Sequence, residues 1–233
     1  MDLELLPGLK QNPLASDVLD GDSPLARLDA LAALAVSWVA PVHFRVAHTE
    51  QERQAAYRLR YQAVIEHGWL QTADLPEGRE HDEYDDQAVH ILAWDGETPV
   101  ATCRLVLPAA GLPAVWLPLP TEIAFDIQVK PAGEVVDAGR FVVARAYSSQ
   151  EHLLLGCLLA RTWLEVRALG YTRCCAAFAS RGMLRVFSRM GFRYQVLAPS
   201  RYYWGCERYP LLFDVADSAA SLVENWIPGT LVR

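Results

Sequence analysis

Residues 170–194, GYTRCCAAFASRGMLRVFSRMGFRY, carry the pattern that decides the fold class. The residues YTRCCAAF form a strand-like run, and the short helical segment after them closes at Gly191. Two further runs, RYQVLAP at 193–199 and YPLLFDV at 209–215, indicate closing strands. A strand, a short helix and a returning strand form one α/β unit in which the helix packs on a sheet.

The chain upstream of this unit alternates between strands and helices. VHFRVA at 42–47 and EVVDAGRFVVA at 134–144 indicate strands, and the two apolar runs that flank GETP at 96–99 indicate a hairpin. Hairpins mixed with crossover helices imply a mixed sheet with helices on its faces, so the predicted fold class is α/β. By contrast, GLPAVWLPLPTE at 111–122 is too rich in proline for a central strand and should form a loop.

Two helices are predicted from capping boxes, in which a Ser or Thr and a Glu three residues later satisfy the free N–H groups of the first turn. The first box, at residues 49–52, opens a helix that runs to about Glu66. The second box, at residues 148–151, opens a helix that Gly170 stops.

Residues 1–40 are predicted to be an extension ahead of the main domain, residues 41–233. Pro, Asp, Gly and Ser mark positions 7–23, and leucines at 25, 28, 31 and 34 give a short helix one apolar stripe. We expect this helix to pack on the main body. A membrane-surface role is less favoured because its polar face carries almost no Lys or Arg.

Composition excludes several classes of protein. The formal net charge of -7 argues against nucleic acid as the main partner, because phosphate binding needs clustered cations. No apolar run reaches the roughly 18–20 residues that span a bilayer, and the acidic start MDLELLPGLK is unlike a signal peptide. The 5 cysteines show neither zinc-site nor disulfide spacing. We therefore expect a cytoplasmic protein with reduced thiols, no metal and no tightly bound cofactor.

Arginines within predicted helices and strands are candidate functional residues. Arg58 and Arg60 lie on the first main helix, whereas Arg104 and Arg140 are flanked by apolar strand residues. A buried guanidinium is costly unless it is paired and hydrogen-bonded. The alternative is that each arginine projects from an exposed face. The candidate carboxylate partners are Asp82, Asp85 and Asp137.

Two of these partners belong to REHDEYDD at 79–86, which contains five carboxylates in seven residues. The run lacks the glycine and the terminal glutamate of a calcium loop, so a cation site is disfavoured. A solvated acidic loop and one half of an ion-pair network are the two remaining interpretations.

The ordered set of these residues resembles the acyl-carrier-dependent branch of the Gcn5-related N-acetyltransferase (GNAT) superfamily. Residues 170–194 resemble the closing unit of that fold, and the branch includes acyl-homoserine-lactone (autoinducer) synthases, N-acyl amino acid synthases and ornithine-lipid acyltransferases. In the autoinducer synthases an arginine and a tryptophan are followed by D-x-x-D, a strand arginine and an E-x-x-R pair. The resemblance covers about residues 42–195, and the matching positions are Arg60 and Trp69, Asp82 and Asp85, Arg104, and Asp137 with Arg140.

This resemblance implies a GNAT-like twisted mixed sheet and an acyltransferase whose matching positions bind substrate. It also divides the acidic run. Asp82 and Asp85, in register with the family's paired aspartates, are expected to face inward to Arg58, Arg60, Arg104 or Arg140. The solvated acids of the loop are then expected to be Glu80, Glu83 and Asp86.

Two departures from the family bear on the acceptor. Val64 stands where the autoinducer synthases usually carry phenylalanine, and the spacing from there to Trp69 is one residue short. Asp137 replaces the family's glutamate and reaches about one methylene less far. These changes point away from S-adenosylmethionine as the amine donor and leave acyl transfer to another amine.

The acyl donor is predicted from the residues after the strand at 134–144. The usual coenzyme A loop, Gln/Arg-x-x-Gly-x-Gly/Ala, is absent, although Ser148, Ser149 and a helix N-terminus still offer donors. A phosphopantetheine arm carries one phosphate, so we favour acyl carrier protein over free acyl-CoA. A basic set in the second half could dock an acidic carrier protein or equally form solvated helix faces; it comprises Arg161, Arg167, Arg173, Arg181, Arg185, Arg189 and Arg193.

The chemistry requires a neutral amine and a stabilised oxyanion. In the implied fold a backbone N–H near Phe141–Val143 would bind the oxyanion, with Phe141 and Val142 as the named candidates. Asp137 is the first candidate to take the ammonium proton, directly or through water, with Asp82 or Asp85 assisting. The alternative for Asp137 is a structural partner of Arg140 only. Arg104 or Arg140 could bind the acceptor's carboxylate bidentately.

The predicted function is transfer of a fatty acyl group from an acyl-carrier-protein thioester to the amine of an amino acid-like acceptor, which gives an N-acyl amino acid. One alternative is an acyl-homoserine-lactone synthase that uses S-adenosylmethionine. An alternative of another class is a non-catalytic module that binds an acyl carrier or a lipid.

Overall fold

The computed structural model describes residues 23–75, 77–108, 118–130 and 133–226. The strands are β1 (His43–Val46), β2 (Ala88–Asp95), β3 (Thr98–Val106), β4 (Val135–Val143), β5 (Arg173–Ser180), β6 (Tyr194–Val196), β7 (Arg201–Tyr203) and β8 (Cys206–Asp214). The α-helices are α2 (Pro24–Ser37), α3 (Glu50–Glu66), α4 (Pro120–Phe125), α5 (Glu151–Ala168), α6 (Arg181–Met190) and α7 (Val215–Trp226). Short 3-10 helices are η2 (Thr72–Asp74), η3 (Asp85–Gln87) and η4 (Arg145–Gln150).

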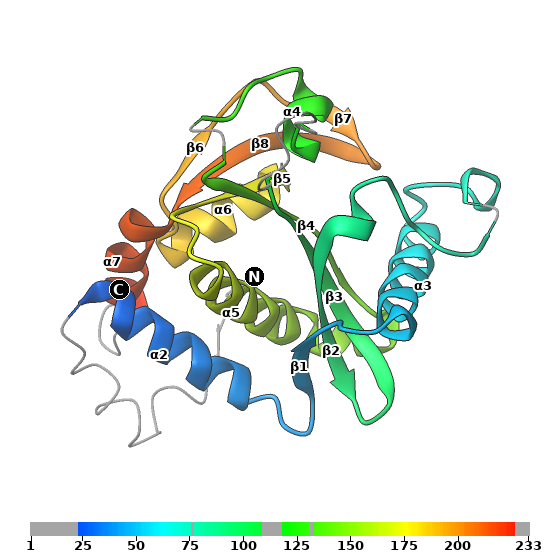
Figure 1. The fold of residues 1–233 in the computed structure, drawn as a ribbon, viewed down its shortest axis with the longest axis horizontal. Coiled ribbons are helices and arrows are strands. Elements are labelled where there is room, and N and C mark those ends of the chain that lie inside the picture. Colours follow the sequence, from blue (N-terminus) through cyan, green and yellow to red (C-terminus); the bar gives the residue numbers. More distant parts are fainter. Residues whose placement is uncertain (1–22, 76, 109–117, 131–132, 227–233) are drawn as a thin grey trace.

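The strands form one mixed sheet with the order β1-β2-β3-β4-β5-β8-β6, and β7 pairs with β8. The only parallel pair among the described strands is β4 with β5, and the others are antiparallel. Figure 1 shows that the sheet is strongly twisted and that its two halves, β1–β4 and β5–β8, diverge. The predicted α/β class with a mixed, twisted sheet is confirmed.

Helices cover both faces of this sheet, as the alternation of side chains along β2 shows. Ile91 and Ala93 pack with Leu154 and Leu158 of α5. Their neighbours Leu92 and Trp94 pack instead with Ala56 and Tyr57 of α3, on the opposite face. Further along the sheet, α6 lies on the α5 side and α4 on the α3 side (Figure 1).

A bulge in β4 opens the middle of the sheet. Arg104 of β3 lies opposite Gly139, but Thr102 lies opposite Val142, so β4 contains one extra residue between these pairs. Within the bulge Arg140 adopts a left-handed backbone with φ of 58°. The pairing of β4 with β5 ends at Ala138, opposite Ala176. Beyond this point the two central strands separate, and Figure 1 shows α5 below the gap between them.

Two local predictions are wrong. The box at residues 148–151 does not form, because residues 145–150 already make the 3-10 helix η4 and the N-cap of α5 is Gln150, without a side-chain bond. The predicted loop at 111–122 ends in α4, which begins at Pro120; a proline at the first helical position loses no hydrogen bond. Residues 111–117 of that loop lie outside the described residues. Two further elements, β7 and α7, were not predicted.

The helix of the N-terminal extension is α2, and it packs against α5 and α7. Leu28 and Leu31 join Leu222 and Val223 of α7 in one buried cluster. Asp29 accepts a hydrogen bond from the Trp163 indole at 2.7 Å and pairs with Arg167, which ties α2 to α5. The division into an extension and a main domain stays a prediction.

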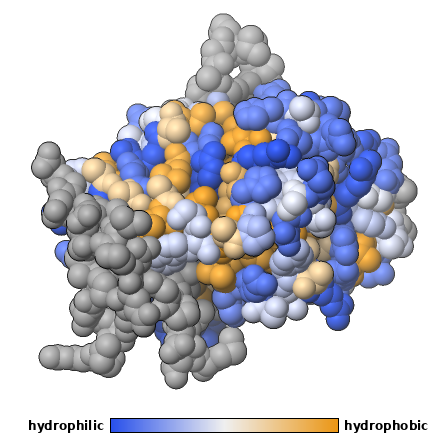
Figure 2. All heavy atoms as spheres, turned by 90° about the horizontal axis from the view of Figure 1, so that it is seen from below, coloured by the Kyte–Doolittle hydropathy of each residue, from blue (hydrophilic) through white to orange (hydrophobic). Residues whose placement is uncertain are grey.

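Figure 2 shows the molecule from below, where hydrophobic residues gather toward one side and the other side is mostly hydrophilic. Within the described ranges, none of the helices combines the length and the apolar character that crossing a membrane requires.

The capping box of α3 gives the first testable prediction. Thr49 Oγ1 accepts from the Glu52 N–H at 3.2 Å, and Glu52 Oε2 accepts from the Thr49 N–H at 3.0 Å. We expect Thr49→Ala to lower the free energy of unfolding by about 1 kcal/mol, because the Glu52 N–H in the first turn of α3 loses its side-chain acceptor. Urea denaturation measures this difference. The matched control is Ser148→Ala, which removes no cap and should change stability by less than about 0.5 kcal/mol; equal effects of the two substitutions would contradict this assignment.

Candidate active site

Arg60 of α3 lies in a buried ion-pair network that the acidic run completes. The side chain is 1% exposed. Its two terminal nitrogens bind the Asp85 carboxylate bidentately at 2.9 and 2.7 Å, and its Nε lies 2.6 Å from Glu80 Oε2. These two carboxylates neutralise the buried guanidinium, and an unpaired charge in the interior would be strongly destabilising.

The two strand arginines join the same network. Arg104 binds Asp82 bidentately at 2.6 and 3.0 Å, and its Nη1 also lies 2.8 Å from Asp85 Oδ1. Arg140 reaches Glu80 Oε1 through Nε at 3.0 Å and Asp82 Oδ2 through Nη2 at 3.0 Å. The network therefore balances three arginines with three carboxylates, and the expectation that Asp82 and Asp85 face inward agrees with this geometry.

The prediction for Glu80 of the acidic run is wrong. It was expected to be solvated, but it is 3% exposed and bridges Arg60 and Arg140. The Glu80 N–H donates to the Tyr57 carbonyl at 3.1 Å, which holds this part of the loop against α3. Glu83 and Asp86 are exposed, as expected, and Arg58 lies on the exposed side of α3, outside the network.

Electrostatics at the centre of the network favour the charged forms. Burial alone would raise the pKa of Asp85, but the hydrogen bonds and charge of Arg60, and then of Arg104, hold that pKa well below its usual range. Neighbouring His90 is also buried, and burial lowers its pKa. The neutral ring donates from Nε2 to the Asp85 carbonyl at 3.0 Å, so this histidine helps to fix the loop.

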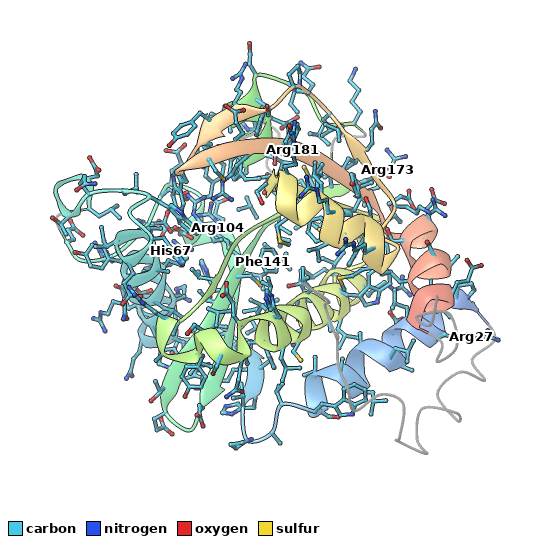
Figure 3. All side chains as sticks on the ribbon, turned by 180° about the vertical axis from the view of Figure 1, so that it is seen from behind. Arg27, His67, Arg104, Phe141, Arg173 and Arg181 are labelled. Atoms are coloured by element: carbon cyan, nitrogen blue, oxygen red, sulfur yellow. The ribbon has the colours of Figure 1, made fainter. Side chains whose placement is uncertain are left out.

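A cavity of about 240 Å³ lies in the gap between β4 and β5. Its middle is lined by Ala138 to Val142 of β4 and by Cys174, Ala176, Phe178 and Ala179 of β5. Figure 3 shows Phe141 in the middle of the molecule, above α5, with Arg104 and His67 on the α3 side. One end of the cavity is mostly apolar, and its lining comprises Leu155, Leu159, Trp163 and Val166 of α5, Met183 and Phe187 of α6, Phe192, Phe213 and Val215, with Thr162, Asp214 and Ser218 as its polar members.

The opposite end of the cavity is aromatic and cationic. Arg140 stacks on the ring of Trp204 at 4.2 Å, and Arg208 stacks on Trp69 at 5.4 Å. The two tryptophan rings lie 6.2 Å apart, and all four side chains line the cavity. Arg60, Trp69 and Arg140, three of the predicted substrate-binding residues, thus line this cavity, and their role toward a substrate stays a prediction. Arg104, Asp82 and Asp85 support this end from behind and do not line the cavity.

Trp204 and Arg208 were not predicted. Trp204 belongs to the tight turn between β7 and β8, where Trp204 and Gly205 both have positive φ, 46° and 78°, and Arg208 lies in β8 just after that turn. A Cβ on Gly205 would lie 2.7 Å from Trp69 Cδ1, so only glycine lets Trp69 pack this closely. The Trp-Gly dipeptide between two strand-like runs was the available signal for the turn; the sequence carried no signal for Arg208.

The backbone of β4 offers N–H groups at the gap. The N–H of Ala144 donates to the Val100 carbonyl at 2.8 Å, and Val142 lies opposite Thr102. Residues two apart along a strand point their N–H groups to the same side, so Val142 also faces β3. Phe141 and Val143 then face the side from which β5 has separated. Of the two predicted oxyanion donors, Phe141 has the suitable direction and Val142 does not.

Asp137 is buried behind the cavity rather than on its surface. Oδ2 accepts from the Thr121 N–H at 2.8 Å and from the Thr121 hydroxyl at 2.5 Å. The carboxylates that pair with Arg140 are Glu80 and Asp82, so the structural alternative, with Asp137 as the partner of Arg140, does not match these contacts. Oδ1 lies 3.9 Å from where a Cβ of Gly139 would stand, and Gly139 lines the cavity.

The predicted phosphate donors lie apart from this lining. Ser148 and Ser149 are exposed in η4, just ahead of α5. Their role toward a phosphopantetheine arm stays a prediction. Among the residues that the structure describes, no group of three His, Cys, Asp or Glu side chains is arranged to hold a metal ion.

The burial of Asp137 gives a prediction about pH. Burial raises its pKa to about 6, and the hydrogen bonds from Thr121 offset part of that effect. The folded protein holds the Asp137 proton more tightly than the unfolded chain, whose pKa is about 3.9. The stability from this proton is fully present below about pH 4 and is lost as pH rises through about 6. We therefore expect the free energy of unfolding of wild type, relative to that of Asp137→Asn, to fall by about 3 kcal/mol as pH rises across this range.

Denaturant unfolding of both proteins at several pH values measures this difference. Groups that both proteins share, including Asp85, cancel in the comparison. Glu83→Gln, at an exposed position of the acidic run, is the matched control for the loss of a carboxylate that is not buried, and it should change stability by less than about 0.5 kcal/mol. Parallel pH profiles for wild type and Asp137→Asn would show that Asp137 titrates normally.

Comparison with known proteins gives one family match and several structural matches. Residues 59–157 match the family model described as "Acetyltransferase (GNAT) domain". No curated protein matches the sequence.

Three solved structures illustrate the similarity in fold. TofI, solved in a ternary complex with an inhibitor and MTA, is 21% identical with a TM-score of 0.57, over 78% of this chain and 96% of its own. BjaI, a CoA-dependent acyl-homoserine lactone synthase solved with SAM and isopentyl-CoA, is 19% identical with a TM-score of 0.59, over 79% and 88%. FeeM, an N-acyl amino acid synthase from uncultured soil microbes, is 14% identical with a TM-score of 0.55, over 79% and 96%.

The predicted GNAT fold is confirmed by the solved structures, and the predicted class of enzyme, an acyltransferase, by the match of residues 59–157 to the acetyltransferase (GNAT) family model. Residues 59–157 therefore match an acetyltransferase (GNAT) domain, and the chain has the fold of TofI, BjaI and FeeM.

Proposed function

We propose that this protein transfers a fatty acyl group from an acyl-carrier-protein thioester to the amine of an amino acid-like acceptor. The observation that carries the proposal is one cavity with two chemically different ends. The apolar end, between α5 and α6, suits a hydrocarbon chain, because burying each CH₂ group stabilises binding by about 0.8 kcal/mol. The aromatic and cationic end suits a small polar acceptor.

The reacting thioester carbonyl would lie between these ends, at the β4 bulge. There the N–H groups of Phe141 and Val143 point toward the gap, where they can donate to the oxyanion that forms when the amine attacks. The amine adds to the carbonyl carbon, the oxyanion collapses, and the C–S bond breaks to release the carrier thiolate. The ammonium proton must leave before or during the attack.

Asp137 would take that proton through a water molecule. Asp137 lies behind Gly139, so it cannot contact the amine directly. Thr121 bonds only Oδ2, which leaves Oδ1 to bind a water molecule, and Gly139 has no side chain to separate Oδ1 from the cavity. A pKa of about 6 leaves the carboxylate charged at neutral pH while keeping it basic enough to accept a proton.

An acyl carrier protein as the donor is supported by α6. Arg181, Arg185 and Arg189 recur every four residues, so they form one stripe, and all three are exposed. Arg185 and Arg189 form no ion pair within the described part of the chain. Carrier proteins are acidic, and complementary charge speeds association and fixes orientation. The exposed Ser148 and Ser149 would bind the phosphate of the phosphopantetheine arm.

The main test is the identity of the product. We expect cells that express the protein to accumulate N-acyl amino acids, detected by mass spectrometry of lipid extracts. The control is Phe141→Pro, which removes the proposed N–H donor and should abolish the product. Accumulation of an acylated lactone would support the synthase alternative instead, and the absence of any acylated amine would favour a non-catalytic binding module.

A second test concerns the donor. We expect Arg185→Glu to raise the KM for acyl-acyl carrier protein several-fold and to leave the KM for acyl-CoA unchanged, because the reversed charge affects only protein docking. Steady-state kinetics with both donors measures this. Arg58→Glu is the matched control, since it reverses an exposed charge on the opposite face of the sheet. Equal effects of Arg185→Glu on both donors would count against docking on α6.

A further inference from the structure

Arg208 of β8 is a cation at the cavity that, among the described residues, no acid neutralises. Its Nε donates to the Tyr203 carbonyl at 3.0 Å and its Nη2 to the Trp204 carbonyl at 3.1 Å. These bonds do not use Nη1. Within the described residues Arg208 takes part in no ion pair, although it is partly buried and lines the cavity. A positive charge held beside an apolar cavity without a counter-charge is a site for an anion.

A second positive charge, on the neighbouring strand β7, makes an anion beside Arg208 more favourable. Arg201 of β7 lies directly opposite Arg208 in the ladder, and like charges in this position repel. Arg201 itself donates to the Ala124 carbonyl and also forms no ion pair in the described ranges. The hairpin thus presents two cations on one face, of which Arg208 borders the cavity.

The other cavity arginines are already neutralised. Arg60 is bound by Asp85 and Glu80, and Arg140 is bound by Glu80 and Asp82. Neither offers uncompensated charge, and the fully paired Arg104 does not reach the cavity. The expectation that Arg104 or Arg140 binds the acceptor's carboxylate is therefore less favourable than binding by Arg208.

The surroundings of Arg208 also have the shape of an acceptor subsite. Its guanidinium rests on Trp69, the Trp69 ring is tilted by 35° against that of Trp204, and Arg140 rests on Trp204, so the four groups form one row. Arg140 is the bulge residue, next to the Phe141 N–H. An acceptor whose anion lies at Arg208 would therefore extend along two indole rings toward the reacting centre.

We propose that Arg208 binds the carboxylate of the acceptor, so that the acceptor is a free amino acid rather than a simple amine. This inference rests on the proposed function and deepens it. A guanidinium and a carboxylate form a charge-assisted bond, which should favour an amino acid over its uncharged carboxamide by about 10- to 100-fold in affinity.

Binding and turnover together test this. Quenching of tryptophan fluorescence measures binding at Trp69 and Trp204 without any turnover, with L-amino acids and their carboxamides as probes. We expect wild type to bind the best amino acid at least about tenfold more tightly than its carboxamide. Arg208→Gln should remove this preference and leave carboxamide binding unchanged, whereas Arg208→Lys should restore part of it. Arg201→Gln is the matched control and should keep the preference.

The outcomes separate this inference from the proposed function. Equal binding of amino acid and carboxamide by wild type overturns the role of Arg208, whether or not an acyl product forms, and needs no variant to fold. If Arg208→Gln weakens the binding of amino acid and carboxamide equally, the inference is also overturned, because Arg208 would then only support the β7–β8 turn. Selective binding of amino acids without an acylated product would support the subsite and refute the acyl transfer.

Discussion

The buried pairing of three guanidiniums with three carboxylates is the constraint on which the site depends. Each arginine comes from a different element, Arg60 from α3, Arg104 from β3 and Arg140 from β4, and every acid comes from the loop at 79–86. Taking one charge out of water without its partner costs several kcal/mol, so the six side chains order together. The loop is therefore fixed against the α3 face, and the charged end of the cavity keeps one geometry.

The same strand that holds Arg140 also separates two chemical environments. On the α3 side β4 presents Asp137 and supports the ion pairs, while on the α5 side Val136 and Ala138 belong to the apolar core. The extra residue at the bulge ends the pairing with β5 and leaves a gap that passes from one environment to the other. A long apolar chain and a charged acceptor can meet there because the sheet is interrupted, whereas a continuous sheet would keep them on opposite faces.

Sequence alone predicted the elements whose periodicity and caps are local, such as α3 and the hairpin of β2 with β3. It also predicted that Asp82 and Asp85 would face the arginines, because their spacing matches a known pattern. Glu80 was missed because nothing in its neighbourhood distinguishes a buried glutamate from a solvated one. Arg208 was missed for a related reason, since its position at the cavity depends on how the β7–β8 hairpin folds back over Trp69, which is a contact between residues far apart in the chain.

Backbone strain and charge are linked at this site. Three described residues other than glycine have positive φ, and two of them, Arg140 and Trp204, stack on each other at 4.2 Å. A left-handed residue with a large side chain costs of order 1–3 kcal/mol and persists only where its surroundings fix it. Arg140 is fixed by Glu80 and Asp82, and Trp204 is fixed by Arg140, by Trp69 and by the bond that its carbonyl accepts from Arg208. The ion-pair network thus holds the bulge, and the bulge in turn supports the aromatic wall against which an acceptor would bind.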